Sequence, residues 1–117
     1  MARKTWAIQR VPEPGGGDSY LNGISCSSPV ACTAVGVWIN RSLHSLLLAE
    51  RWNGKTWAIE DTPSPPGRDS VFNAVSCPSA TGCVAVGHDR SGPLAARWNG
   101  KAWALMHIPA RMAAART

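Results

Sequence analysis

The sequence predicts an all-β fold made of two four-stranded antiparallel units, with one extra strand before them. Three observations support this prediction. A motif centred on a tryptophan occurs three times, apolar runs of strand length recur, and turns rich in Gly, Pro and Asn separate them. The 117 residues include 11 Gly and 9 Pro, which is typical of a single domain with many short connections.

The internal repeat is clearest in the segment Lys-Thr-Trp-Ala-Ile at residues 4–8. The same five residues return at 55–59, and Lys-Ala-Trp-Ala-Leu stands at 101–105, so the offsets are 51 and then 46 residues. Further matches occur at offset 51: Pro12 with Pro63, Asp18-Ser19 with Asp69-Ser70, Asn22 with Asn73, Ser25-Cys26 with Ser76-Cys77, Cys32 with Cys83, and Ala34-Val35-Gly36 with Ala85-Val86-Gly87. Repetition of this kind predicts duplicated structural units.

Each unit divides into four expected strands. In the first unit they are 20–26, 32–37, 45–52 and 55–61, and in the second 71–77, 83–88, 94–98 and 101–107. Residues 4–11 match the fourth strand of each unit. The predicted organisation is an N-terminal outer strand at 1–14, a first unit at 18–62, a second unit at 69–109 and a disordered tail at 110–117.

Asn-Gly pairs follow Trp52 and Trp98 and predict two-residue type I′ hairpins. In the first unit this turn would place Trp52 opposite Lys55 and Glu50 opposite Trp57. Each sheet would then have one face of large residues and one of small residues. The large residues are Leu48, Trp52, Trp57 and Ile59, then Leu94, Trp98, Trp103 and Leu105; the small face carries Ala49, Arg51 and Ala58, then Ala95, Ala102 and Ala104. Such sheets are expected to stack, large face on small face.

Units of about 45 to 50 residues with four meandering strands and a tryptophan signature are typical of β-propeller blades. Another all-β fold, such as an Ig-like sandwich, is the alternative. Nine strands are one more than two blades need, and two blades alone would leave two large faces exposed. We therefore expect further blades of a longer chain or a homo-oligomer, with a trimer of six blades favoured.

A family resemblance rests on Ser25-Cys26, on residues 32–36 (Cys-Thr-Ala-Val-Gly) and on residues 52–57 (Trp-Asn-Gly-Lys-Thr-Trp). These segments resemble the Trp-rich, Cys-paired β-propeller repeats of secreted bacterial proteins, with kelch-like and Asp-box-like blades, most of them uncharacterised. The resemblance extends from residue 4 to about residue 109. Residues 54–57 are similar to the second half of an Asp-box, but Trp52 stands at the Asp position, so no sialidase chemistry is implied.

The four cysteines form two Cys-x5-Cys pairs, Cys26 with Cys32 and Cys77 with Cys83. Each pair flanks an expected tight turn, and two structural disulfides are the preferred interpretation, with free buried thiols or a metal site as alternatives. Disulfides suggest an extracellular location. The opening residues MARKTWAIQR lack the apolar segment of a signal peptide, so the location stays uncertain.

The tryptophans divide into two predicted roles. Trp6, Trp57 and Trp103 are expected to pack in the core between units. Trp52 and Trp98, beside the Asn-Gly turns, are expected to be partly exposed, and with Arg51 and Arg97 they are the candidate ligand-binding residues. Trp38, in the expected longer loop of the first unit, is a further candidate.

Charge and motifs limit the function classes. The net charge of +5 is dispersed rather than clustered, so no nucleic-acid partner is expected. No apolar run approaches membrane-spanning length. Asp18-Ser19 and Asp69-Ser70 are expected to cap turns locally, with a calcium site as the alternative.

No catalytic motif is present, and no cofactor or metal is expected. The predicted function is a non-catalytic binding or scaffold module for a carbohydrate or a protein. The alternatives are a fragment of a propeller enzyme whose catalytic blades are missing, and a truncated product with no independent role.

Overall fold

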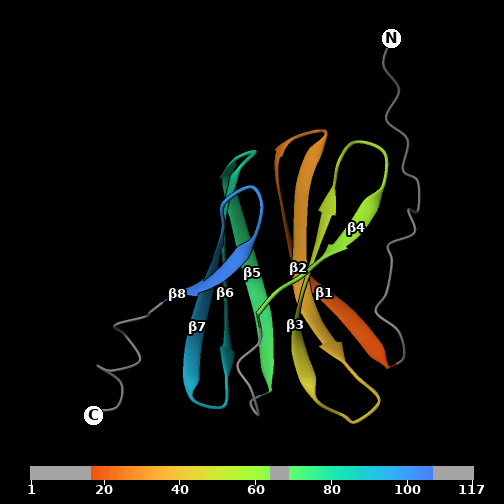
Figure 1. Cartoon of the computed structure of the whole chain (residues 1–117), viewed down its shortest axis with the longest axis vertical. Coiled ribbons are helices and arrows are strands. Elements are labelled where there is room, and N and C mark those ends of the chain that lie inside the picture. The colour runs from red at the N-terminus through yellow and green to blue at the C-terminus, as the bar shows by residue number, and fades with distance from the viewer. Residues whose placement is uncertain (1–16, 64–68, 107–117) are drawn as a thin grey trace.

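The computed structural model describes residues 17–63 and 69–106, which form eight strands and contain no helix (Figure 1). Sheet 1 consists of β1 (Asp18–Ser28), β2 (Ala31–Ile39), β3 (Ser45–Trp52) and β4 (Trp57–Glu60). Sheet 2 consists of β5 (Ser70–Ser79), β6 (Gly82–Asp89), β7 (Gly92–Trp98) and β8 (Trp103–Met106). In both sheets the strands follow chain order and pair antiparallel. The predicted all-β fold with two four-stranded sheets is therefore confirmed; the extra strand at 4–11 and the tail lie outside the described residues.

The two sheets repeat each other down to their irregularities. The pairing of β1 with β2 shifts between Leu21 and Gly23, and that of β5 with β6 shifts at the matching place between Phe72 and Ala74. Gly36 lies opposite the first shift, and a Cβ atom there would collide with the backbone carbonyl oxygen of Tyr20. A close approach of two backbones therefore requires glycine at this position, and Gly87 has the same environment in sheet 2.

Both predicted disulfides are present. Cys26 bonds to Cys32 and Cys77 bonds to Cys83, and the Cα atoms lie 3.9 and 4.1 Å apart. Each bridge joins the two strands of the first hairpin of its sheet, at the end next to the turn. No free cysteine remains among the described residues, so the alternatives of free thiols and of a cysteine metal site do not apply.

The predicted register of the Asn-Gly hairpins is wrong by two residues. Trp52 pairs with Trp57, and the loop between them has four residues instead of two. The reason is the side chain of Asn53, whose Oδ1 accepts hydrogen bonds from the backbone N–H groups of Lys55 and Thr56, at 2.8 and 2.9 Å. This Asx-type cap holds a wider turn in which only the glycine has positive φ. Asn99 does the same in sheet 2. A shift of two residues preserves the alternation, so the faces stay as predicted.

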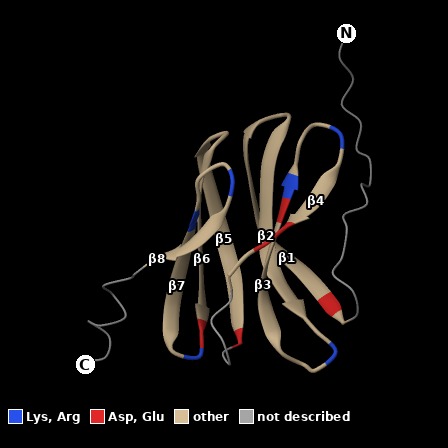
Figure 2. Ribbon diagram, in the orientation of Figure 1, with Lys and Arg blue, Asp and Glu red and all other residues tan. Residues whose placement is uncertain are grey.

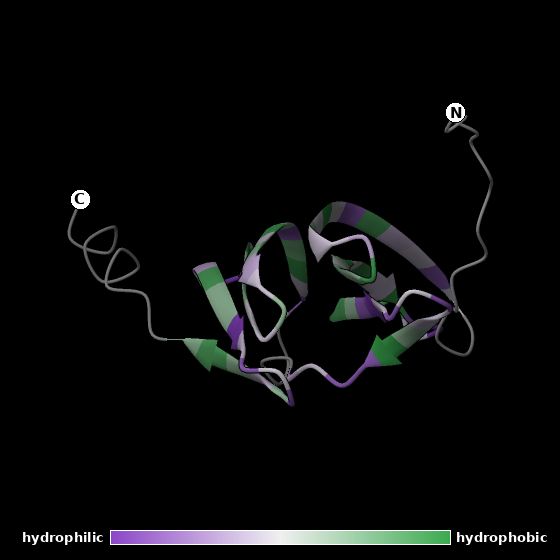
Figure 3. Ribbon diagram, turned by 90° about the horizontal axis from the view of Figure 1, so that it is seen from above, coloured by the Kyte–Doolittle hydropathy of each residue, from purple (hydrophilic) through white to green (hydrophobic). Residues whose placement is uncertain are grey.

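The two sheets pack face to face, and the core lies between them. Sheet 1 contributes its face of smaller residues with Val35, Leu47 and Ala49, while sheet 2 contributes its large-residue face: Phe72, Cys77, Cys83, Ala85, Leu94, Ala96, Trp98 and Trp103. This is the large-on-small stacking that the sequence predicts. Figure 3 shows the underlying alternation of hydrophobic and hydrophilic bands along the strands.

Two hydrogen bonds set the alignment of the sheets at their first strands. Asn22 Nδ2 donates to the carbonyl oxygen of Phe72 at 2.8 Å, and the backbone N–H of Cys77 donates to Ser25 Oγ at 2.9 Å. Charged residues, in contrast, lie mostly near the strand ends and in the connections (Figure 2). The two sheets do not close into a ring, so their assignment as propeller blades stays a prediction.

Candidate functional site

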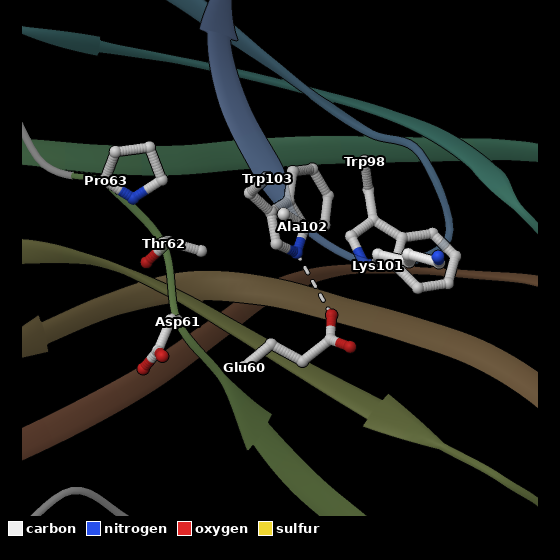
Figure 4. Close-up of a pocket in the computed structure, with 8 residues that line it drawn as sticks. All are labelled: Glu60, Asp61, Thr62, Pro63, Trp98, Lys101, Ala102 and Trp103. Carbon is white, nitrogen blue, oxygen red and sulfur yellow. Dashed lines mark hydrogen bonds between the residues drawn. The ribbon is translucent and has the colours of Figure 1, made fainter.

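A pocket of about 530 Å³ opens where the end of sheet 1 meets the last hairpin of sheet 2. One wall is the end of β4 and the residues after it, Glu60, Asp61, Thr62 and Pro63. The opposite wall is the β7–β8 hairpin, with Trp98, Lys101, Ala102 and Trp103 (Figure 4). The pocket therefore exists only because the two repeats pack against each other.

Two hydrogen bonds fix the acidic wall. Glu60 Oε1 accepts from Trp103 Nε1 at 3.0 Å across the junction. Thr62 Oγ1 donates to the carbonyl oxygen of Leu47 at 2.9 Å, which ties the segment after β4 back to β3. The side chain of Asp61, between them, is exposed. This wall therefore offers carboxylate oxygens held on a braced backbone.

The opposite wall carries donors. Lys101 is exposed in the hairpin loop, while Trp98 is only 4% exposed. The Nε1 atom of Trp98 is buried, and it has no hydrogen-bond partner among the described residues. A buried indole N–H is normally satisfied, because leaving it unpaired costs about 1–3 kcal/mol. The pocket is therefore lined by a residue whose buried N–H donor is not satisfied by the described residues.

The prediction that the Trp98 side chain is partly exposed is wrong, because it is buried. The guanidinium of Arg51 covers its ring, with Cζ 3.8 Å from the ring centroid. Arg51 is held there by hydrogen bonds to Thr33 Oγ1, at 3.1 Å, and to the carbonyl oxygen of Ala80, at 2.8 Å. The structure therefore brings Arg51 and Trp98 together as a contact between sheets, which sequence adjacency within one unit did not suggest.

The other candidate ligand-binding residues are not among those that line this pocket. Trp52 is half-buried as predicted; its ring packs against Trp57 at 5.7 Å between centroids, and its Nε1 donates to the carbonyl oxygen of Pro29. Arg97 is exposed on the outer face of β7. Trp38 belongs to β2 and not to a loop, and it lines a second pocket of about 290 Å³ with Leu46, Leu48 and Ile59. The two pockets share the wall formed by Glu60, Asp61 and Thr62. Their role in binding stays a prediction.

The core role predicted for tryptophans holds for Trp103, which is buried against Phe72 with ring centroids 5.8 Å apart. Trp57 is only half-buried. Trp6 lies outside the described residues. The difference between Trp103 and Trp57 follows from the packing, because sheet 2 has its large-residue face against a neighbour and sheet 1 has the same face turned away.

Asp69 does not cap a local turn as predicted. Its Oδ1 accepts from the backbone N–H of Ser45 in the other sheet, at 3.1 Å, and its Oδ2 accepts from Arg90 at 2.8 Å. The Ser45 N–H, and secondly Arg90, lower the pKa of the Asp69 carboxyl below its ordinary value. Asp69 is therefore a clamp between the sheets.

Within residues 17–63 and 69–106, no three His, Cys, Asp or Glu side chains are grouped as a metal site would require. In the same part of the chain, no helix is suited by length and hydropathy to cross a membrane. Comparisons with protein-family models, curated proteins and solved structures found no match to this chain.

Sequence reasoning missed Glu60, Asp61 and Lys101 as site residues. Glu60 and Asp61 precede Lys101 by about 40 residues along the chain, and no single repeat contains both walls of the pocket. The available signal was the acidic pair at the end of a strand, Glu60 and Asp61, together with the stacking of one unit on the next.

Proposed function

We propose that the two sheets are blades of a β-propeller and that the chain is a non-catalytic binding module. Its ligand site is the pocket between the sheets, and its ligand class is carbohydrate. The observation that carries this proposal is the buried Nε1 of Trp98, which has no partner among the described residues; Trp98 lines a pocket that also offers Glu60, Asp61 and Lys101.

The chemistry of the pocket favours a sugar. Hydroxyl groups both donate and accept hydrogen bonds, and this pocket is lined by residues with carboxylate, indole and ammonium groups. Its volume of about 530 Å³ fits within the range of small-ligand pockets. A protein partner would use a broader surface, and the sugar is therefore the better match to a pocket of this size.

A paired substitution tests the site. Trp98→Phe removes the N–H group and keeps an aromatic ring, and Trp52→Phe is the matched control at the equivalent position of the other sheet. We expect Trp98→Phe to weaken sugar binding about tenfold, since one hydrogen bond is lost, while Trp52→Phe leaves binding unchanged. A glycan array identifies the sugar, and titration calorimetry with that sugar measures both variants.

Lys101→Met and Lys55→Met form a second matched pair, because both lysines occupy the same hairpin position and only Lys101 lines the pocket. Equal effects of the two members of either pair would place the ligand elsewhere. A correctly folded chain that binds no sugar on the array would refute the carbohydrate class. The alternative of a propeller-enzyme fragment would locate its catalytic groups on blades outside this chain and stays a prediction.

A further inference from the structure

The contact between sheet 1 and sheet 2 uses a strip on β5 and a strip on β2. Phe72 on β5 is fully buried, and Val75 packs against the same core. On the receiving side Val35 is fully buried and Thr33 is 1% exposed. These four positions are the centre of the large-on-small contact between the two repeats.

The same positions in the other repeat are exposed. Leu21 and Ile24 on β1 are the equivalents of Phe72 and Val75, and they are 40% and 59% exposed; we call them the β1 strip. Val84 and Val86 on β6 are the equivalents of Thr33 and Val35, and they are 36% and 46% exposed; we call them the β6 strip. The chain therefore carries two uncovered apolar strips at opposite ends of its sheet pair.

We propose that these strips bind each other between copies of this chain, so that the β1 strip of one copy docks on the β6 strip of a second copy. The contact repeats the packing of β5 on β2 within the chain. The occupant is a second copy because the two strips are the two halves of a contact that this fold already makes. The inference stands apart from the sugar site, since none of its residues lines that pocket.

The hydrogen bonds that align the two sheets within one chain can also form between two copies. Within the chain, Asn22 and Ser25 bond to the backbone of β5. Their equivalents, Asn73 and Ser76, are the same residue types and are exposed on β5. Between copies they face the backbone of β1 in the second molecule. Residue types that align one pair of sheets are therefore in place for the next.

Cation–π packing gives a third match. Arg51 of sheet 1 covers the ring of Trp98 in sheet 2. The equivalent pair is Arg97, which is exposed, and Trp52, which is half-buried. The guanidinium of Arg97 in one copy would cover the ring of Trp52 in the next, an arrangement in which an arginine and an indole attract each other. These two predicted site residues thus acquire a role in assembly.

The contact is heterologous, because each copy uses a different strip on each side. Such contacts continue until a ring closes or a filament forms. Propeller rings of about 4 to 8 blades are closed structures. Three copies give six sheets, which is the middle of that range, and this is the assembly we expect.

Two surface variants test the proposal. Ile24→Glu places a charge on the β1 strip and Val86→Glu places one on the β6 strip; both side chains are exposed, so the fold is retained. Leu43→Glu is the control, since Leu43 is 79% exposed in the β2–β3 loop and belongs to neither strip. Light scattering after size exclusion measures the mass against the 12.4 kDa of one chain, and circular dichroism verifies folding.

We expect an oligomer for the parent chain and for Leu43→Glu, and a monomer for each strip variant alone. An equimolar mixture of Ile24→Glu and Val86→Glu should form a dimer and nothing larger, because it contains one intact pair of strips. A monomeric parent chain at all concentrations overturns the proposal. So does an oligomer that survives Val86→Glu, or a mixture that stays monomeric.

Discussion

Truncation of Phe72 is the sharpest test of the packing between the two sheets. Among the described residues Phe72 is the largest wholly buried side chain, and it contacts Trp103 within the core. Replacing a buried phenylalanine with alanine typically costs about 3–5 kcal/mol, from lost burial and from the cavity that remains. Phe72 is fully enclosed, and its replacement also removes the ring contact with Trp103. We therefore expect Phe72→Ala to lower the free energy of unfolding by about 4 kcal/mol.

Leu21→Ala is the matched control, because Leu21 occupies the same position in sheet 1 and is 40% exposed. Its truncation leaves no closed cavity and should cost about 1 kcal/mol. Both changes are measured in the Val86→Glu background, so that association between copies does not add to the stability.

Urea unfolding followed by tryptophan fluorescence, without reductant, gives the free energies. With a slope of about 1.5 kcal/mol per molar, Phe72→Ala should move the midpoint down by about 2–3 M. Equal shifts for Phe72→Ala and Leu21→Ala would refute the asymmetry between the repeats. A shift below about 1 M for Phe72→Ala would refute the placement of that ring in the core.

Three further predictions concern the bridges, the clamp and the backbone contact. The double variant Cys26→Ser/Cys32→Ser should lose about 2 kcal/mol, because the bridge closes a loop with a sequence separation of only 6; its urea midpoint verifies this, and an unchanged midpoint contradicts it. Asp69 has a lowered pKa in the folded state, so its contribution is present above the unfolded value of 3.8 and is lost as the pH falls through the folded pKa. The difference in stability between the parent chain and Asp69→Asn should therefore be largest near neutral pH and shrink in acid; a difference that is constant with pH would contradict the role of the charge. Gly36→Ala should cost about 3 kcal/mol or more, since the new Cβ meets a backbone carbonyl oxygen. The control Gly82→Ala meets only a side-chain oxygen at 3.1 Å, and similar melting temperatures for the two variants would exclude the collision.

The fold was predictable where the repeat and the alternation of residues carried the information. All eight strands were placed from the apolar runs and turn residues, and the disulfides from the Cys-x5-Cys spacing. The hairpin register was not predictable from Asn-Gly alone, because it depends on whether the Asn53 side chain caps the loop. The local sequence is compatible with both the two-residue and the four-residue loop, and the hydrogen bonds of the folded turn decide between them.

The candidate site was less predictable, because it depends on contacts between repeats. The Trp98 ring is covered by the guanidinium of Arg51, which is 47 residues away along the chain. The bond from Ser45 to Asp69 likewise joins different sheets. Two copies of one motif therefore have different environments, and the order of the repeats decides which copy is covered.

The meander connection of each sheet also determines the order in which the protein can mature on the ribosome. Every ladder joins strands that are adjacent in the chain, so hairpins close early and with little loss of chain entropy. Sheet 1 is complete at Glu60, before Phe72 has been synthesised. For that interval the nascent chain presents Val35 and Leu47 to water. A pause in translation at this point would prolong the exposure of this apolar surface to chaperones and to neighbouring chains.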